Sequence, residues 1–266
     1  MPPIVSIITL NWSHPEAKYR HVIRELLDTI SITTGVSYEL VVVDNSSPDP
    51  TTTGLLEHYR DDGIITTLVL SPENHYFCEG NNIGVRFSNP ESKYILLLSS
   101  DIKVLRPDWL WKLVQWMEPP FTFFTLPYDI ISLGWSPDKN VQPSMVRPEG
   151  FCCMFRRRVW RDLDPAFVQC NGLEEAIALS IRAGARCGVL ANMAKYIHHG
   201  PGSESWRVRE EITAKTTRQP DYRKWFDGLT IHTLDFTLTQ ADKDRMTATD
   251  DYWLREQHNF KAFEDW

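Results

Sequence analysis

The sequence has no uninterrupted apolar stretch close to the roughly 18 residues that a membrane helix needs. It also has no basic start followed by a small-residue cleavage site, as a secretory signal would have. Positive charge is scarce, because 28 Lys and Arg stand against 35 Asp and Glu, for a formal net charge of −7. Without a broad basic field, nucleic acid is not an expected partner. We expect a soluble, cytoplasmic protein without a transmembrane segment.

Cysteine is rare and irregularly spaced. The five cysteines form no C-x-x-C pair, and an odd number cannot all close as intramolecular disulfides. Reduced thiols in a cytosolic compartment fit this pattern best, and a disulfide framework is the minority alternative. The composition is otherwise ordinary for a globular protein, with 42% apolar and 24% charged residues. A chain of 266 residues can form one large α/β domain with a short appendage.

Strand-like and helix-like segments alternate through the first hundred residues, which is the pattern of βαβ units and a mostly parallel sheet. The strand-like runs are short and rich in Val, Ile and Leu, as in strands that are buried on both faces. The helix-like runs repeat apolar residues at helical spacing. The sequence predicts strands at 4–10, 40–43, 64–70 and 94–98, and helices between 13 and 35, over 51–59 and 79–87, and from 109 onward.

A second ordered stretch follows residues 118–147, which are rich in proline and aromatic residues and have poor periodicity. This stretch predicts strands at 151–155 and 187–190 and a helix over 174–183. Beyond residue 205 the chain is charged, with scattered Trp and Tyr and no buried-strand run. We therefore expect an α/β domain over residues 1–204, with helices flanking the sheet, and a helical or extended appendage over residues 205–266.

Two aspartates stand just beyond the carboxyl ends of predicted strands. Asp44 follows the strand at 40–43, and Asp101 follows the strand at 94–98. In open α/β sheets, ligands bind outside the carboxyl ends of the strands. The sequence therefore predicts a ligand site at this edge of the sheet.

A series of motifs at these strand ends resembles family 2 glycosyltransferases, particularly the rhamnosyltransferase-like branch. Residues 43–47 (VDNSS) are similar to that branch's VDNxS turn. Residues 74–84 resemble its N-x-G-F-x-x-G-N-N-x-G segment, with Tyr76 in place of the usual first glycine. Residues 97–101 with 107–110, and then 198–203, resemble its L-N-x-D block with the following helix and its closing His-Gly segment. The resemblance covers about residues 4–203 and implies a GT-A fold that transfers a sugar from a nucleoside diphosphate donor.

Such a transfer expels a diphosphate, and a divalent cation that bridges the phosphates neutralises its growing charge. Mg²⁺ and Mn²⁺ prefer oxygen ligands and commonly take one or two carboxylates. The resemblance implies that Asp101 is the first metal ligand and that His198 or His199 contacts the metal or the diphosphate. Ser99 stands where the motif has its first Asp or Asn, which predicts weaker metal binding. The alternative role of Asp101 is to cap the segment that follows it.

The resemblance also suggests which residues bind the donor. Asp44 would accept hydrogen bonds from the nucleobase or the ribose, a role compatible with stabilising the turn before Pro48. The other candidates for donor binding are Thr9, Asn11, Asn81, Asn82 and Ser100.

The acceptor of the sugar is expected to be a glycan or another compound with a hydroxyl group. A base must take the proton of this hydroxyl as it attacks the sugar. Glu174 and Glu175 begin a predicted helix and match the family's acidic pair, with Glu175 as the expected base. Alternatively, the two glutamates only complement the helix dipole.

The favoured interpretation is an inverting hexosyl or deoxyhexosyl transferase. A retaining GT-A enzyme is the nearest alternative, and Ser99 also allows a catalytically impaired protein that binds nucleotide sugars. An NAD-dependent Rossmann enzyme is disfavoured, because no G-x-G-x-x-G follows the first strand. In the expected appendage, Trp206, Trp225, Trp253 and Trp266 need a surface to bury against, either over the acceptor side or in a homo-oligomer.

Overall fold

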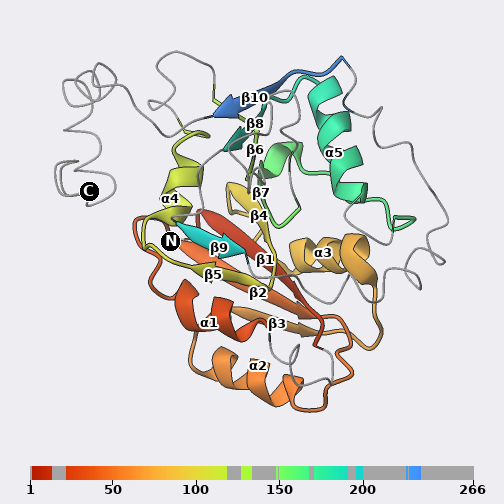
Figure 1. The fold of residues 1–266 in the computed structure, drawn as a ribbon. Coiled ribbons are helices and arrows are strands. Elements are labelled where there is room, and N and C mark those ends of the chain that lie inside the picture. The colour runs from red at the N-terminus through yellow and green to blue at the C-terminus, as the bar shows by residue number, and fades with distance from the viewer. Residues whose placement is uncertain are drawn as a thin grey trace.

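The computed structural model describes residues 2–13, 22–118, 127–133, 148, 150–167, 171–190, 196–199, 226 and 228–234. Within these residues, one sheet contains β1 (Val5–Asn11), β2 (Tyr38–Asp44), β3 (Thr67–Leu70), β4 (Tyr94–Leu98), β6 (Ile130–Leu133), β7 (Cys152–Arg156), β8 (Cys187–Leu190) and β10 (Ile231–Leu234). Their order across the sheet is β10-β8-β6-β7-β4-β1-β2-β3 (Figure 1). Only β7 runs antiparallel to its neighbours in this sheet. The expected α/β architecture with a mostly parallel sheet is confirmed.

Helices cover both faces of this sheet (Figure 1). They are α1 (Arg24–Ile30), α2 (Thr52–Asp61), α3 (Tyr76–Phe87), α4 (Trp109–Val114) and α5 (Asn171–Arg182). Side chains of α1, α2 and α4 share one buried cluster with Ile7 and Val42. Side chains of α3 and α5 share a second cluster with Ile8 and Val41. Because successive strand residues point to opposite faces, β1 and β2 contribute to both clusters.

Four short strands lie where the sequence predicts none. β6 falls in the proline-rich and aromatic stretch, and β5 (Ile102–Val104) pairs with β9 (Ile197–His199) in a separate two-stranded sheet. β10 falls within residues 205–266 and extends the main sheet beside β8. A truncated variant that tests the expected appendage should therefore keep residues 1–234, so that β10 stays in the sheet. Within residues 205–266, the structure describes residues 226 and 228–234. The four tryptophans of this segment lie outside the described residues.

The helices of the described residues are short. None of them has both the length and the apolar character that crossing a membrane demands.

α3 lies close to β1 because two of its glycines approach the strand. A Cβ atom on Gly84 would lie 2.3 Å from Cγ2 of Ile8, and one on Gly80 would lie 2.6 Å from Cδ1 of Leu10. Carbon atoms do not approach each other so closely, so a side chain at either position would push the helix away or force its neighbour to move. The two glycines thus set the distance between α3 and β1, and with it the place where α3 begins.

We expect Gly84→Ala to lower the free energy of unfolding by about 1–3 kcal/mol, because overpacking outweighs the gain in helix propensity. The matched control is Gly54→Ala in α2, where nothing lies within 4 Å of the added Cβ. That change should raise the free energy of unfolding by about 0.5–1 kcal/mol. Urea unfolding measures both variants, and equal stabilisation in the two would show that α3 moves away from β1 at little cost.

Candidate active site

Polar side chains follow neighbouring strands at the carboxyl edge of the sheet. Asp101 follows β4, Asn11 ends β1 and Asp44 ends β2. Asn11 and Asp44 are direct partners in the β1–β2 register. The three residues are 2% (Asn11), 5% (Asp44) and 6% (Asp101) exposed. The structure thus brings these three sequence-predicted residues to adjoining strand ends.

The carboxylate of Asp44 organises the turn after β2. Nδ2 of Asn11 donates a hydrogen bond to Oδ1 of Asp44 at 2.9 Å, and the hydroxyl of Ser47 donates to the same oxygen. The backbone N–H of Ser47 donates to Oδ2 at 3.3 Å. Ser46 has a φ of 58°, in the left-handed region that such polar turns tolerate. Since a carboxylate has about four acceptor positions, Asp44 retains acceptor capacity for a ligand.

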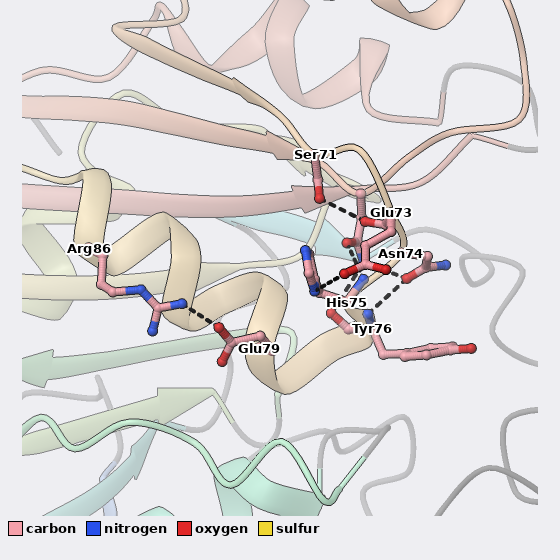
Figure 2. A network of polar contacts seen from close by, with 8 residues as sticks. Ser71, Glu73, Asn74, His75, Tyr76, Glu79 and Arg86 are labelled. Carbon is pink, nitrogen blue, oxygen red and sulfur yellow. Dashed lines mark hydrogen bonds and ion pairs between the residues drawn. The ribbon is translucent and has the colours of Figure 1, made fainter.

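Asn45 connects this turn to the loop before α3. Its Nδ2 donates to Oδ1 of Asn74 at 2.7 Å, and its Oδ1 accepts from the backbone N–H of His75 at 2.8 Å. Oδ1 of Asn74 also accepts from the backbone N–H of Tyr76 at 2.8 Å (Figure 2). The residues Asn45, Ser47 and Asn74 are not among the sequence-predicted site residues, although each lies in a motif that the sequence displays. Together they fix the start of α3 relative to Asp44.

Tyr76 has a φ of 56°. It replaces the glycine that is usual at this position of the resembled motif, and glycine adopts positive φ without steric cost. The backbone conformation therefore gives a physical reason for a glycine there, and Tyr76 holds the same conformation with a large side chain.

Asp101 lies in the turn between β4 and β5. The hydroxyl of Ser99 donates a hydrogen bond to Oδ1 of Asp101. β9 is antiparallel to β5, which puts His199 opposite Ile102 and His198 opposite Lys103. The pairing thus brings the backbone of both histidines beside the segment that immediately follows Asp101.

Among the described residues, no group of three or more His, Cys, Asp or Glu side chains is arranged to hold a metal ion. A cation that binds together with a diphosphate needs fewer protein ligands, because phosphate and water complete the shell. Asp101 offers one carboxylate as a ligand. Ser99 donates a hydrogen bond to this carboxylate and supplies no second carboxylate. These donors fit a cation that arrives with a nucleotide better than one held by the protein alone.

Thr9 and Ser100 lie beside these residues in the chain. Thr9 is fully buried in β1, two residues before Asn11, and its hydroxyl has no hydrogen-bond partner in the described part of the chain. Ser100 precedes Asp101 and is also buried. Both positions are near the strand ends, and their contact with a donor remains a prediction.

Asn81 and Asn82 make hydrogen bonds within the protein. Nδ2 of Asn82 donates to the carbonyl of Leu163 at 2.8 Å, and Oδ1 accepts from the N–H of Leu163 at 2.9 Å. Nδ2 of Asn81 donates to the carbonyl of Phe77 at 2.7 Å. Both side chains are buried. The structure shows packing roles for these amides, and their contact with a donor also remains a prediction.

The first turn of α5 packs against the first turn of α3. A Cβ on Gly172 would lie 2.6 Å from Sγ of Cys78. Because α3 begins next to the turn after β2, this contact places the start of α5 near the same edge of the sheet. Glu174 and Glu175 are half-buried there, while Leu173 and neighbouring apolar residues of α5 face the core.

Three of the buried cysteines are poorly suited to act as nucleophiles. Burial raises the pKa of Cys152 and Cys153 well above the usual value and raises the pKa of Cys187 to about 12. A thiol that stays protonated at neutral pH is a poor nucleophile. These three residues and Cys78 form no disulfide among the described residues, and Cys170 lies outside those residues.

Comparisons with known proteins agree with this geometry. The model of a family described as Glycosyl transferase family 2 matches residues 7–173, which is more than half of the chain. No curated protein matches the sequence.

Two solved structures share the fold. The mannosyltransferase PcManGT from Pyrobaculum calidifontis, in complex with GDP-Man and Mn²⁺, has a TM-score of 0.56 and 17% identity, over 85% of this chain and 67% of its own. S. aureus TarS 1–349, in complex with UDP, has a TM-score of 0.54 and 15% identity, over 98% of this chain and 73% of its own. At these identities the likeness establishes the GT-A fold and nothing finer.

Proposed function

Because the chain belongs to glycosyl transferase family 2, we propose that it transfers a hexose or deoxyhexose from a nucleoside diphosphate sugar to a hydroxyl acceptor, with inversion at the anomeric carbon. The observation that carries this proposal is the alignment of Asp101, Asn11 and Asp44 at adjoining strand ends. An extended nucleotide sugar presents its base, ribose, diphosphate and sugar in that order. From β2 to β4 the strand ends carry Asp44, then Asn11, then Asp101. Asp44 would thus meet the base and ribose, and Asp101 the diphosphate.

The base and the ribose belong at Asp44 in this arrangement. Its carboxylate retains acceptor capacity, and uracil, thymine and guanine each present an N–H group to such an acceptor. The diphosphate belongs at Asp101, two strands away in the sheet. Asn11 lies between them and orients Asp44 through its 2.9 Å hydrogen bond.

Asp101 is the protein carboxylate that would hold Mg²⁺ or Mn²⁺ against the two phosphates. Such an ion, when bound, supplies positive charge that stabilises the departing diphosphate. The β5–β9 register puts the backbone of His198 and His199 beside the segment after Asp101, so one of these two histidines is the proposed second protein ligand. The complex of PcManGT with GDP-Man and Mn²⁺ supports this choice of ion.

Glu175 is the proposed general base. The acceptor hydroxyl transfers its proton to the Glu175 carboxylate as its oxygen attacks the anomeric carbon, and the bond from that carbon to the diphosphate breaks. Attack from the face opposite the leaving group inverts the configuration. Glu174 precedes it by one position, and in a helix adjacent side chains point about 100° apart, so only one of the two can aim at the acceptor.

The metal assignment makes a prediction about binding order. Because Ser99 supplies no carboxylate where the motif has its first Asp or Asn, Mn²⁺ should bind the free protein about 5- to 150-fold more weakly than it binds the protein with UDP or GDP, the range of typical coupling between two ligands. Titration calorimetry in both conditions measures this difference. Tight Mn²⁺ binding by the free protein would contradict the assignment.

The proposed function is tested by a thermal-shift screen of nucleotide sugars with and without Mn²⁺, followed by an assay of nucleotide release. Bound ligand raises the apparent stability by mass action, which identifies the donor. Donor hydrolysis without acceptor then shows turnover, and NMR of the transferred sugar separates inversion from retention. Binding without hydrolysis or transfer would instead favour an impaired nucleotide-sugar-binding protein, the alternative that Ser99 raises.

A further inference from the structure

Tyr76 combines an unfavourable backbone conformation with a large side chain. It is the first residue of α3, and its φ of 56° is in the region that residues other than glycine, asparagine and aspartate rarely adopt. Among the described residues, Ser46 is the one other non-glycine residue with positive φ, and it lies in the turn that follows Asp44. Residues in such conformations concentrate at functional sites, where surrounding contacts hold them in place.

Hydrogen bonds with two asparagine side chains hold Tyr76 in this conformation. Its N–H donates to Oδ1 of Asn74 at 2.8 Å, and its carbonyl accepts from Nδ2 of Asn45 at 3.2 Å. Asn45 directly follows Asp44, and its own N–H donates to the carbonyl of Asn11 at 2.8 Å. The position of Tyr76 is therefore coupled to the residues that hold the Asp44 carboxylate.

The ring of Tyr76 extends away from the body of α3 at the carboxyl edge of the sheet. Figure 2 shows it projecting beyond the first turn of the helix, on the opposite side of the network from Arg86. Its side chain is half-buried. The ring thus presents an aromatic surface at the edge where Asp44 lies.

The hydrogen bond from Asn45 to its carbonyl places Tyr76 beside the turn after β2. The order β4-β1-β2 puts Asp101 after the first of these strands and Asp44 at the end of the third. With strands about 4.8 Å apart, the ends of β4 and β2 are roughly 10 Å apart. Tyr76 therefore lies on the Asp44 side of the site, where the base of an extended nucleotide sugar belongs in the proposed arrangement.

We propose that the ring of Tyr76 is a stacking surface for the nucleobase of the donor. This inference rests on the proposed function and assigns a specificity-determining residue to it. Asp44 accepts a hydrogen bond from the edge of the base, and Tyr76 covers one face of the base. Since every base has a π-face, stacking supplies affinity for all of them, and the Asp44 carboxylate selects those with an N–H edge.

The test compares nucleotide and diphosphate binding in the full chain. With Mn²⁺ present, Tyr76→Gly should bind UDP or GDP about 5- to 150-fold more weakly than the wild type, the usual range for one base stacked on one ring. Tyr76→Phe retains the ring and should bind within about twofold of the wild type, because stacking does not require the hydroxyl. Inorganic pyrophosphate lacks a base, so its affinity should be the same in all three proteins.

A stability measurement separates stacking from a merely structural role. Glycine tolerates the positive φ, so Tyr76→Gly should unfold at the same temperature as the wild type or higher. Tyr76→Leu keeps apolar bulk without a π-face and should show a loss of nucleotide affinity close to that of Tyr76→Gly. This variant also serves as the test if the glycine variant does not fold.

Wild-type affinity for UDP and GDP in both Tyr76→Gly and Tyr76→Leu would overturn the inference, as would an equal loss of pyrophosphate binding. If the wild-type protein binds none of UDP, GDP and dTDP, the proposed function itself fails. The two failures are therefore distinguishable.

Discussion

Asp101→Asn should remove nearly all sugar transfer. Asp101 is the proposed carboxylate ligand of the cation, and the charge stabilisation that such an ion supplies is worth several kcal/mol, so the rate should fall by roughly a hundredfold or more. The hydroxyl of Ser99 donates to Oδ1 of Asp101 in the structure and can donate to an asparagine carbonyl in the same way. The variant should therefore fold normally, which circular dichroism and its melting temperature would show.

The control for Asp101→Asn is Asp62→Asn, which removes an exposed carboxylate at the end of α2. Initial rates with and without EDTA should show that the control behaves like the wild type and that EDTA abolishes activity in both. Full turnover in EDTA, or a rate for Asp101→Asn close to that of the control, would exclude Asp101 as an essential metal ligand.

Glu175→Gln should separate binding from chemistry. Glutamine keeps the shape and the hydrogen-bonding capacity of the side chain but does not take a proton at neutral pH. Donor affinity should therefore survive, while transfer falls by roughly 10²- to 10⁴-fold, the usual contribution of general-base catalysis. Calorimetry with the nucleotide and an assay of sugar transfer measure the two effects separately.

Glu174→Gln is the matched control, because it makes the same change one position earlier on α5. It should retain most of the transfer activity. Loss of transfer in Glu174→Gln alone would assign the base to Glu174, and normal transfer in both variants would show that the base lies elsewhere.

The main features of the sheet were predictable from the sequence. β1, β2 and β4 are runs of apolar residues buried on both faces, and such runs are visible without any knowledge of tertiary structure. Asp44 and Asp101 end or follow two of these strands, so their place at the carboxyl edge followed from the strand assignment. The replacement of a glycine by Tyr76 was also visible, although its positive φ became known only from the structure.

The features that the sequence did not predict depend on tertiary contacts. β5 and β10 are three and four residues long, and they become strands by pairing with β9 and β8. The β5–β9 register, which brings His199 beside the segment after Asp101, carries no local signal. Asn82 and Leu163 are 81 positions apart in the sequence, and no local signal indicates the hydrogen bonds between the Asn82 side chain and the Leu163 backbone.

The most direct test of the account is the release of nucleoside diphosphate from a panel of nucleotide sugars with Mn²⁺, measured for the wild-type protein and for Asp101→Asn. The account predicts that the wild type cleaves at least one donor that raises its melting temperature, and that Asp101→Asn leaves this donor almost intact. Failure of the wild type to bind or cleave any of the donors, or equal cleavage by the two proteins, would contradict a metal-assisted glycosyltransferase site at this edge of the sheet.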